Sequence, residues 1–244
     1  MINIFKKFWD PNIKAIESVM PTVEAIIEQE EKVSKLSLSD MQIRVDKMRE
    51  ELKPLLDKIT NDQKDNIKTK KEFGLDEKEI QKKLYSYIPE FFAFLREINN
   101  RKFNKKHFKV QLIASVILAK GNSLTELRTG EGKTQVFHMP SALYGLTGRG
   151  SHVVTVNDYL ARRDGEYAGH AIADLGITVG IVTPQACYKF VRDEDLLATK
   201  GEEAVKARKD LNVASLTQMN GVNLVECSKQ ESYSQDIVYG TNNE

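Results

Sequence analysis

Apolar residues in the first part of the chain recur three and four residues apart, which is the spacing of amphipathic helices. One helix is predicted over 12–33. Pro21 is expected to kink or restart it, because proline removes a backbone hydrogen bond. A second helix is predicted after Ser39, which forms a capping-box pattern with Gln42.

Helical spacing resumes near Asp76 and becomes strongly apolar after Pro89, which fits the first position of a helix. Between these helices, residues 60–71 are polar and lysine-rich, so they are predicted to form a connection. The pattern therefore predicts a helical amino-terminal region over residues 1–100.

After residue 100 short β-branched runs begin to alternate with helical stretches. The predicted strands are 123–128, 151–156, 177–182 and 236–239. This alternation predicts an α/β domain over 101–244 with a parallel sheet, and ligands bind at the carboxyl ends of such strands. Residues 183–235 are too long for a simple connection, so they are predicted to be an insertion at the edge of the sheet.

The run Thr129-Gly130-Glu131-Gly132-Lys133-Thr134, here called the glycine loop, follows one predicted strand and opens a helix that reaches about residue 146. Its glycines allow successive N–H groups to converge on one anion, and the helix start adds unpaired N–H groups. In nucleotide sites a lysine placed like Lys133 reaches the β- and γ-phosphates, and a threonine like Thr134 helps to hold Mg²⁺. The alternative is a glycine turn that happens to precede Lys-Thr.

Composition limits the partners. A net charge of +1 gives no global field towards nucleic acid or membrane. Cys187 and Cys227 lie far apart and match no metal or redox spacing, which favours a reducing cytosol. Residues 1–9 mix Ile, Phe and Trp with two lysines, so they either lie on a membrane surface or dock on their own domain.

A basic cluster precedes the glycine loop. It forms either a solvated face or a nucleic-acid contact, and its members are Arg101, Lys102, Lys105, Lys106 and Lys109. Gln111 follows, and its amide could read an adenine edge or be an ordinary helix residue. The histidines are scattered, and His138 and His152 are predicted to be packing or surface residues.

Two runs are distinctive: V-T-V-N-D-Y-L-A-R-R-D over 154–164 and Y-G-T-N-N-E over 239–244. Together with the glycine loop they resemble the SecA family, the ATP-driven motors of bacterial preprotein secretion. The resemblance covers most of the chain outside 57–85 and 183–235. It implies a P-loop NTPase fold of the RecA or helicase-like type, built on the predicted parallel sheet.

The resemblance also implies a site for ATP and Mg²⁺. Gln111 would read adenine, residues Thr129 to Thr134 would hold the phosphates, and Thr134 would contact Mg²⁺. The further motor motifs would comprise Asn157, Asp158, Arg163, Asp164, Gly240, Thr241 and Asn242.

For the complete protein the resemblance implies ATP hydrolysis that moves unfolded preproteins through a membrane channel of the SecY/E/G type. It further implies contact with an anionic membrane surface, a homodimer, and a cytoplasmic location peripheral to the membrane, with no nucleic-acid partner. The chain stops at Glu244, before the acidic motif of this family, so we expect an amino-terminal fragment without ATPase activity of its own. The alternatives are a nucleic-acid helicase of the same motor class and a non-hydrolysing fragment that binds the channel or a partner motor.

Overall fold

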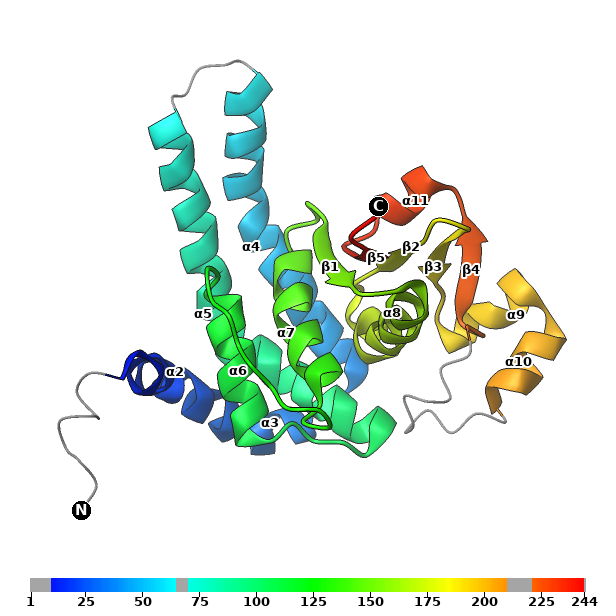
Figure 1. Cartoon of the computed structure of the whole chain (residues 1–244), viewed down its shortest axis with the longest axis horizontal. Coiled ribbons are helices and arrows are strands. Elements are labelled where there is room, and N and C mark those ends of the chain that lie inside the picture. Colours follow the sequence, from blue (N-terminus) through cyan, green and yellow to red (C-terminus); the bar gives the residue numbers. More distant parts are fainter. Residues whose placement is uncertain (1–9, 65–69, 210–220, 244) are drawn as a thin grey trace.

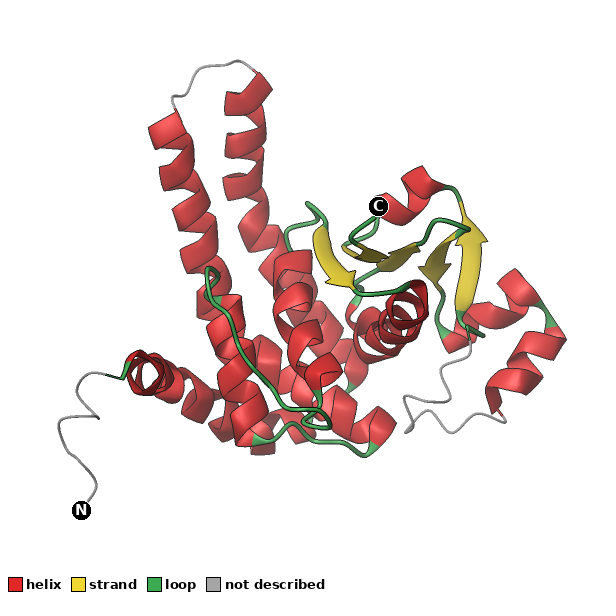
Figure 2. Ribbon diagram, viewed as in Figure 1, coloured by secondary structure: helices red, strands yellow, loops and turns green. Residues whose placement is uncertain are grey.

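The computed structural model describes residues 10–64, 70–209 and 221–243, and it places a helical region beside a five-stranded sheet (Figure 1). Figure 2 shows the separation by colour, with the strands gathered on one side and helices packed against them. The membrane-surface interpretation of residues 1–9 lies outside the described residues. The α/β architecture predicted for the second part of the chain is confirmed.

The amino-terminal region consists of α2 (Pro11–Glu28), α3 (Glu30–Ser34), α4 (Leu38–Lys64) and α5 (Lys70–Phe103). Helix α2 continues through Pro21 and ends at Glu28, so the predicted restart at Pro21 is wrong. A proline inside a helix removes one hydrogen bond. Here the fully buried Val19 and Val23 lie on either side of it, and their packing keeps the helix continuous.

The start of α4 is capped two residues earlier than predicted. The Ser37 N–H donates to Asp40 Oδ2 (3.1 Å) and the Asp40 N–H donates to Ser37 Oγ (3.0 Å). The capping box is therefore Ser37 with Asp40, and the predicted box of Ser39 with Gln42 is wrong. Asp at this position accepts the cap N–H as Glu or Gln does in the usual box.

Helix α5 continues through Pro89, so the helix start predicted there is wrong. Apolar side chains on both sides of the proline are buried, and their burial outweighs one lost hydrogen bond; they include Leu84, Ile88, Phe91, Phe92 and Leu95. The connection predicted over 60–71 is also shorter than expected, because α4 reaches Lys64 and α5 begins at Lys70.

The sheet has the order β1-β5-β2-β3-β4, with strands β1 (Ser151–Thr155), β2 (Val179–Val182), β3 (Cys187–Phe190), β4 (Leu224–Cys227) and β5 (Ile237–Thr241). β5 lies parallel to both β1 and β2, and these three strands confirm the predictions over 151–156, 177–182 and 236–239. β3 and β4 are antiparallel, so the sheet is mixed rather than purely parallel.

The strand predicted over 123–128 is wrong. These residues form an extended coil that runs beside α6 (Lys109–Ala119) towards α7 (Lys133–Gly145), as the green segment of Figure 1 shows. A strand needs a neighbouring strand to bond its N–H and C=O groups. Residues 123–128 have no such neighbour: β1 is the edge of the sheet, and in the described part of the chain it pairs only with β5. The side chain of Leu124 is accordingly 96% exposed.

Residues 183–235 extend the sheet by β3 and β4 and carry η2 (Asp193–Asp195), α9 (Leu196–Lys200), α10 (Glu202–Lys209) and α11 (Lys229–Tyr233). A buried carboxylate on α8 (Asp158–Ile172) anchors the start of β4: Glu166 accepts the N–H groups of Gly221 (2.8 Å) and Asn223 (3.0 Å). η1 (Ala173–Leu175) extends α8.

Helices α8 and α11 cover opposite faces of the sheet. Phe190 of β3 faces α8, where a Cβ on Gly169 would lie 2.2 Å from its ring, so only glycine permits this approach. The next residue towards Cys187, Lys189, faces the other way and pairs with Glu231 of α11 (2.6 Å). Alternate side chains of β3 therefore face α8 and α11 in turn.

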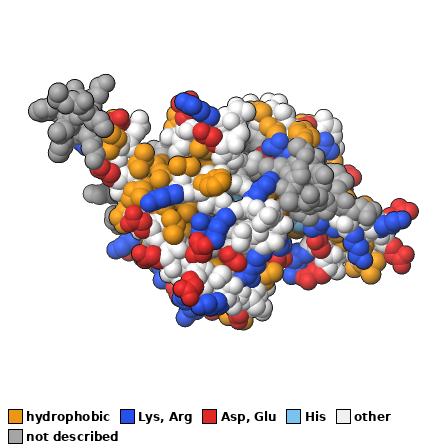
Figure 3. All heavy atoms as spheres, turned by 90° about the horizontal axis from the view of Figure 1, so that it is seen from below, with side chains coloured by type: hydrophobic (Ala, Val, Ile, Leu, Met, Phe, Trp, Pro, Cys, Tyr) orange, Lys and Arg blue, Asp and Glu red, His pale blue; other side chains and the backbone are white. Residues whose placement is uncertain are grey.

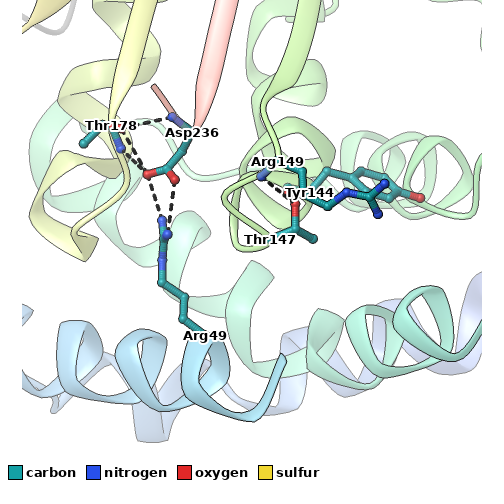
Figure 4. Close-up of polar contacts among 6 residues, drawn as sticks. All are labelled: Arg49, Tyr144, Thr147, Arg149, Thr178 and Asp236. Atoms are coloured by element: carbon teal, nitrogen blue, oxygen red, sulfur yellow. Dashed lines mark hydrogen bonds and ion pairs between the residues drawn. The ribbon is translucent and has the colours of Figure 1, made fainter. Parts of the chain in front are cut away.

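A bidentate ion pair joins the helical region to the sheet (Figure 4). Arg49 of α4 donates to both carboxylate oxygens of Asp236 (3.1 and 2.9 Å), at the residue before β5. Asp236 also accepts the N–H and hydroxyl of Thr178, just ahead of β2. One carboxylate therefore fixes α4 against the starts of two neighbouring strands.

Candidate functional site

The glycine loop lies between the coil 123–128 and α7, whose start at Lys133 confirms the helix predicted there. Gly130 (φ 87°) and Gly132 (φ 81°) both adopt the left-handed conformation that disfavours other residues. A Cβ on Gly132 would lie 2.4 Å from Gln111 Nε2. The left-handed backbone at position 132 therefore favours glycine, and any other residue there would also have to displace the Gln111 amide.

Two side chains of the glycine loop form hydrogen bonds with the backbone of Arg128, the residue just before the loop. The Arg128 carbonyl accepts the Lys133 ammonium (2.9 Å) and the Glu131 N–H (3.2 Å). The Glu131 carboxylate in turn accepts the Arg128 N–H (2.6 Å). Because Glu131 and Lys133 are both exposed, these contacts compete directly with water and with any ligand at the loop.

The first turn of α7 offers backbone donors to a ligand. Within the described residues no acceptor bonds the N–H groups of Gly132, Lys133 or Thr134, whereas Gln135 N–H already donates to the Gly132 carbonyl (3.0 Å). Unpaired N–H groups and the positive end of the helix dipole favour an anion. The arrangement can therefore bind a phosphate group.

Gln111 is buried and links α6 to the glycine loop. Its Oε1 accepts the Phe108 N–H (2.9 Å), and its Nε2 donates to the Glu131 carbonyl (2.9 Å). Nε2 also donates to Gln135 Oε1 (3.4 Å). A glutamine amide has two donor hydrogens and two acceptor lone pairs, so among the described residues only one lone pair of Oε1 has no partner. Reading an adenine edge would require Nε2 to exchange one of its present acceptors for the base. The adenine role of Gln111 stays a prediction.

Three predicted site residues meet behind the loop. The Thr134 hydroxyl donates to Asp164 Oδ1 at 3.4 Å, and Arg163 pairs with the same oxygen through Nε (2.8 Å) and Nη2 (2.7 Å). Burial raises the pKa of Asp164, and the Arg163 guanidinium opposes that rise. The motif on α8 is thus connected to the first turn of α7 through Thr134.

The other motif residues lie where β1 and β5 end. Asn157 caps α8 by accepting the Leu160 N–H (2.9 Å), and Asp158 is the first residue of that helix. Gly240 and Thr241 lie opposite Val154 and Thr155, and Asn242 follows them with an exposed side chain. The Thr241 hydroxyl is buried without a partner in the described part of the chain. No hydrogen bond between described residues joins the glycine loop to residues 240–242.

A buried polar network beneath α7 was not predicted from the sequence. Asn99 Nδ2 bonds His138 Nε2 (3.1 Å), the Tyr167 hydroxyl donates to Asn99 Oδ1 (2.7 Å), and His107 Nε2 bonds the Gln135 carbonyl (3.1 Å). Burial lowers the pKa of His107 to about 4 and that of His138 to about 3. His138 is thus a packing residue as predicted, while His152 is exposed.

Carboxylates pair with four of the five members of the basic cluster. The ion pairs are Arg101 with Glu97 (2.8 Å), Lys102 with Asp174 (2.5 Å), Lys109 with Glu24 (3.8 Å), and Lys106 with Glu30. Seen from below (Figure 3), basic and acidic side chains lie among hydrophobic ones that gather towards the end carrying α2. Paired cations have less charge to offer a phosphate backbone, which favours a solvated face over a nucleic-acid contact.

Neither a metal-binding cluster nor a membrane-spanning helix occurs among the described residues. The described residues include no group of three or more His, Cys, Asp or Glu side chains placed to hold a metal ion. In the same residues, no helix combines the length and apolar character that crossing a bilayer requires.

Comparisons with known proteins agree on one family. The family model described as the SecA DEAD-like domain matches residues 4–244. The chain is 31% identical over 244 residues to the protein translocase subunit SecA of Desulforudis audaxviator, covering all of this chain and 20% of that protein. It is 33% identical to the SecA of Fervidobacterium nodosum over 256 aligned residues, 26% of that protein. Against the Synechocystis SecA it is 41% identical over 175 residues, 72% of this chain and 17% of that protein.

Proposed function

Because the chain belongs to the SecA DEAD-like domain family, we propose that its glycine loop binds the phosphates of ATP for a motor that translocates preproteins. The observation that carries this proposal is the start of α7. There, unpaired N–H groups and the Lys133 ammonium lie beside a left-handed Gly132. That combination suits a polyphosphate rather than a neutral ligand.

The residues of the site fit nucleotide and Mg²⁺. A side chain at position 132 would strain the left-handed backbone of the loop and displace the Gln111 amide. Lys133 is exposed and bonded to a neutral carbonyl, so a phosphate oxygen would be a stronger acceptor for it. Thr134 would hold Mg²⁺ through its hydroxyl, and Gln111 would contact the adenine. When bound, ATP supplies the phosphoanhydride bond whose hydrolysis drives the motor.

Hydrolysis and translocation are proposed for the whole protein. The chain spans about a fifth of the length of the curated relatives it matches, and phosphoryl transfer needs several charged groups around the phosphate at once. We assign the chain's own residues to nucleotide binding. The motifs at Asn157, Asp158, Arg163, Asp164, Gly240, Thr241 and Asn242 would connect that binding to the rest of the motor.

The proposed partners follow from the family. They are unfolded preproteins, a membrane channel of the SecY/E/G type, an anionic membrane surface and a second copy of the motor, with the protein peripheral on the cytoplasmic face. The helicase alternative is not favoured, since the family match is to SecA over nearly the whole chain. The ion pairs of the basic cluster agree with that preference.

Two measurements test the proposal. Titration of the full chain with a fluorescent ATP analogue, with and without Mg²⁺, should show saturable binding that unlabelled ATP competes away. In the complete protein, ATPase activity should rise with channel vesicles and preprotein. Absence of competition would refute nucleotide binding at the loop, and stimulation by RNA instead of preprotein would support a helicase.

A further inference from the structure

The fold brings the two cysteines together, although they are distant in sequence. Cys187 of β3 and Cys227 of β4 are direct partners in the antiparallel register, and both are free thiols of intermediate exposure. Residues directly opposite on antiparallel strands point to the same face, with Cβ atoms about 4.5–5.5 Å apart. Their spacing along the sequence matches no redox motif, and only the strand register brings the two cysteines side by side.

Several contacts fix this register. The pairs continue as Lys189 with Val225 and Phe190 with Leu224, and the Val191 N–H then donates to the Asn223 carbonyl (2.9 Å). Hydrogen-bonded pairs recur at every second residue of an antiparallel ladder. Val191 with Asn223 is a hydrogen-bonded pair, so Lys189 with Val225 and then Cys187 with Cys227 are hydrogen-bonded pairs too. The Cα atoms of a hydrogen-bonded pair lie about 5.5 Å apart. Disulfides span a Cα separation of about 4.4–6.8 Å.

The thiols lie on the face of the sheet that α11 covers. Phe190 faces α8, and strand alternation turns Cys187 and Lys189 towards α11. Cys227 also immediately precedes Ser228, whose hydroxyl caps α11 by accepting the Glu231 N–H (3.1 Å). A bond between the cysteines would therefore fasten the edge strand β4 and the start of α11 to β3.

We propose that Cys187 and Cys227 form a dithiol site that small-molecule disulfides, such as oxidised glutathione, convert reversibly into a cross-strand disulfide. In the first step the thiolate of one cysteine attacks a sulfur of the small disulfide, which forms a mixed disulfide and releases one small thiolate. In the second step the other cysteine's thiolate attacks the protein-bound sulfur and releases the second small thiolate. Two protein thiols are oxidised, one disulfide is reduced to two thiols, and the two protons pass to the released thiolates.

The surroundings favour a reversible bond over a permanent one. The cross-strand Cβ spacing exceeds the about 3.5–4.5 Å of a relaxed disulfide, so the strands must approach slightly, and strained disulfides are more easily reduced. Burial raises the pKa of the Cys227 thiol; the charges of Glu231, Cys187 and Glu226 raise it further, whereas the Lys189 ammonium lowers it. Since only thiolates react, exchange should accelerate as the pH rises.

The full chain is incubated with oxidised glutathione, alkylated with iodoacetamide and digested without reduction. The wild type should lose both thiols together and yield one peptide pair joined through Cys187 and Cys227. The matched variants Cys187→Ser and Cys227→Ser should instead accumulate a stable mixed disulfide with glutathione. If the wild type stops at the same mixed disulfide, links two copies of the chain, or does not react, the proposal is overturned.

A second measurement does not depend on the variants. Phenylarsine oxide bridges two adjacent thiols, so one equivalent should protect both cysteines of the wild type from maleimide. Each serine variant should be protected at least about tenfold less well, because a chelate gains from the high effective concentration of its second thiol. If the wild type needs two equivalents, or is protected no better than the single variants, the two thiols act independently and the site does not exist.

Discussion

The side chains of Lys133 and Glu131 form hydrogen bonds within the glycine loop that a bound ligand would have to replace. Both use the backbone of Arg128, one through its carbonyl and the other through its N–H. A phosphate at the start of α7 would be a better partner for the ammonium than a carbonyl oxygen. Glu131 places a negative charge at the same loop, so ligand affinity reflects a balance between the two side chains.

The first prediction concerns Lys133. Lys133→Ala removes charge-assisted hydrogen bonds worth about 1.5–3 kcal/mol, so the affinity for ATP should fall about ten- to 150-fold. Titration with a fluorescent ATP analogue measures the change. Lys206→Ala, an exposed lysine of α10, is the matched control and should bind as the wild type does. Unchanged affinity of Lys133→Ala would contradict the phosphate site.

The second prediction separates two roles of Gln111. If its amide reads adenine, Gln111→Ala should lower the affinity for ATP more than for GTP, because the two bases present different edges. If Gln111 only connects Phe108 to the Glu131 carbonyl, both nucleotides should lose affinity equally, since the loop itself is altered. Competition of ATP and GTP against one fluorescent analogue decides between these roles.

At the scale of elements, the third prediction tests the ion pair of Arg49 with Asp236. Both side chains are mostly buried, with exposed fractions of 26% and 13%. Arg49→Ala leaves the Asp236 carboxylate without its cation, so the free energy of unfolding should fall by about 2 kcal/mol. Urea denaturation followed by circular dichroism measures it.

Arg44 on the same helix provides the control. It pairs with Glu90, but its side chain is 48% exposed. Exposed pairs contribute about 0–1 kcal/mol, so Arg44→Ala should lower the free energy of unfolding by less than about 1 kcal/mol. Equal losses for the two variants would mean that Asp236 does not join α4 to the sheet.

The elements also show what local sequence can and cannot predict. The β-branched runs at 151–156 and 177–182 became strands, and the Asn157 cap and the helix at Lys133 formed as expected, because local patterns determine them. The helix restart expected at Pro21 and the helix start expected at Pro89 are wrong because burial against distant residues outweighs one lost hydrogen bond. The run 123–128 lacks a strand partner, which no local pattern reveals. The pairing of Cys187 with Cys227 likewise depends on register.

Across the whole molecule, buried imidazoles connect the helical region with the part of the chain that carries the glycine loop. His107 lies ahead of α6 and bonds the backbone of α7, while His138 of α7 bonds Asn99 of α5. Asn99 accepts in turn from Tyr167 of α8. The network therefore spans four segments that meet behind the glycine loop, and its charge state matters for the stability of all of them.

The fourth prediction is that this network makes stability depend on pH. Burial holds the pKa of His107 at about 4 and that of His138 at about 3, whereas both titrate near about 6.5 when unfolded. Below about pH 6.5 the unfolded chain binds protons that the folded chain does not. The stabilisation is thus complete above that pH and is lost as the pH falls towards about 4, by up to about 1.4 kcal/mol per unit for each histidine.

His138→Gln isolates the effect, because glutamine can still accept from Asn99 but does not titrate. Urea denaturation near pH 7.5 and pH 5 should show that the wild type loses about 1–2 kcal/mol more than this variant over the interval. Burial raises the pKa values of Asp164 and Glu166, so these carboxyl groups make the fold more stable as the pH falls, opposite to the histidines. Their contribution is the same in the wild type and in the variant, so it cancels in the comparison. His152→Gln, at an exposed position, should keep the wild-type pH dependence. If His138→Gln keeps it as well, His138 is not the buried neutral group whose protonation destabilises the fold.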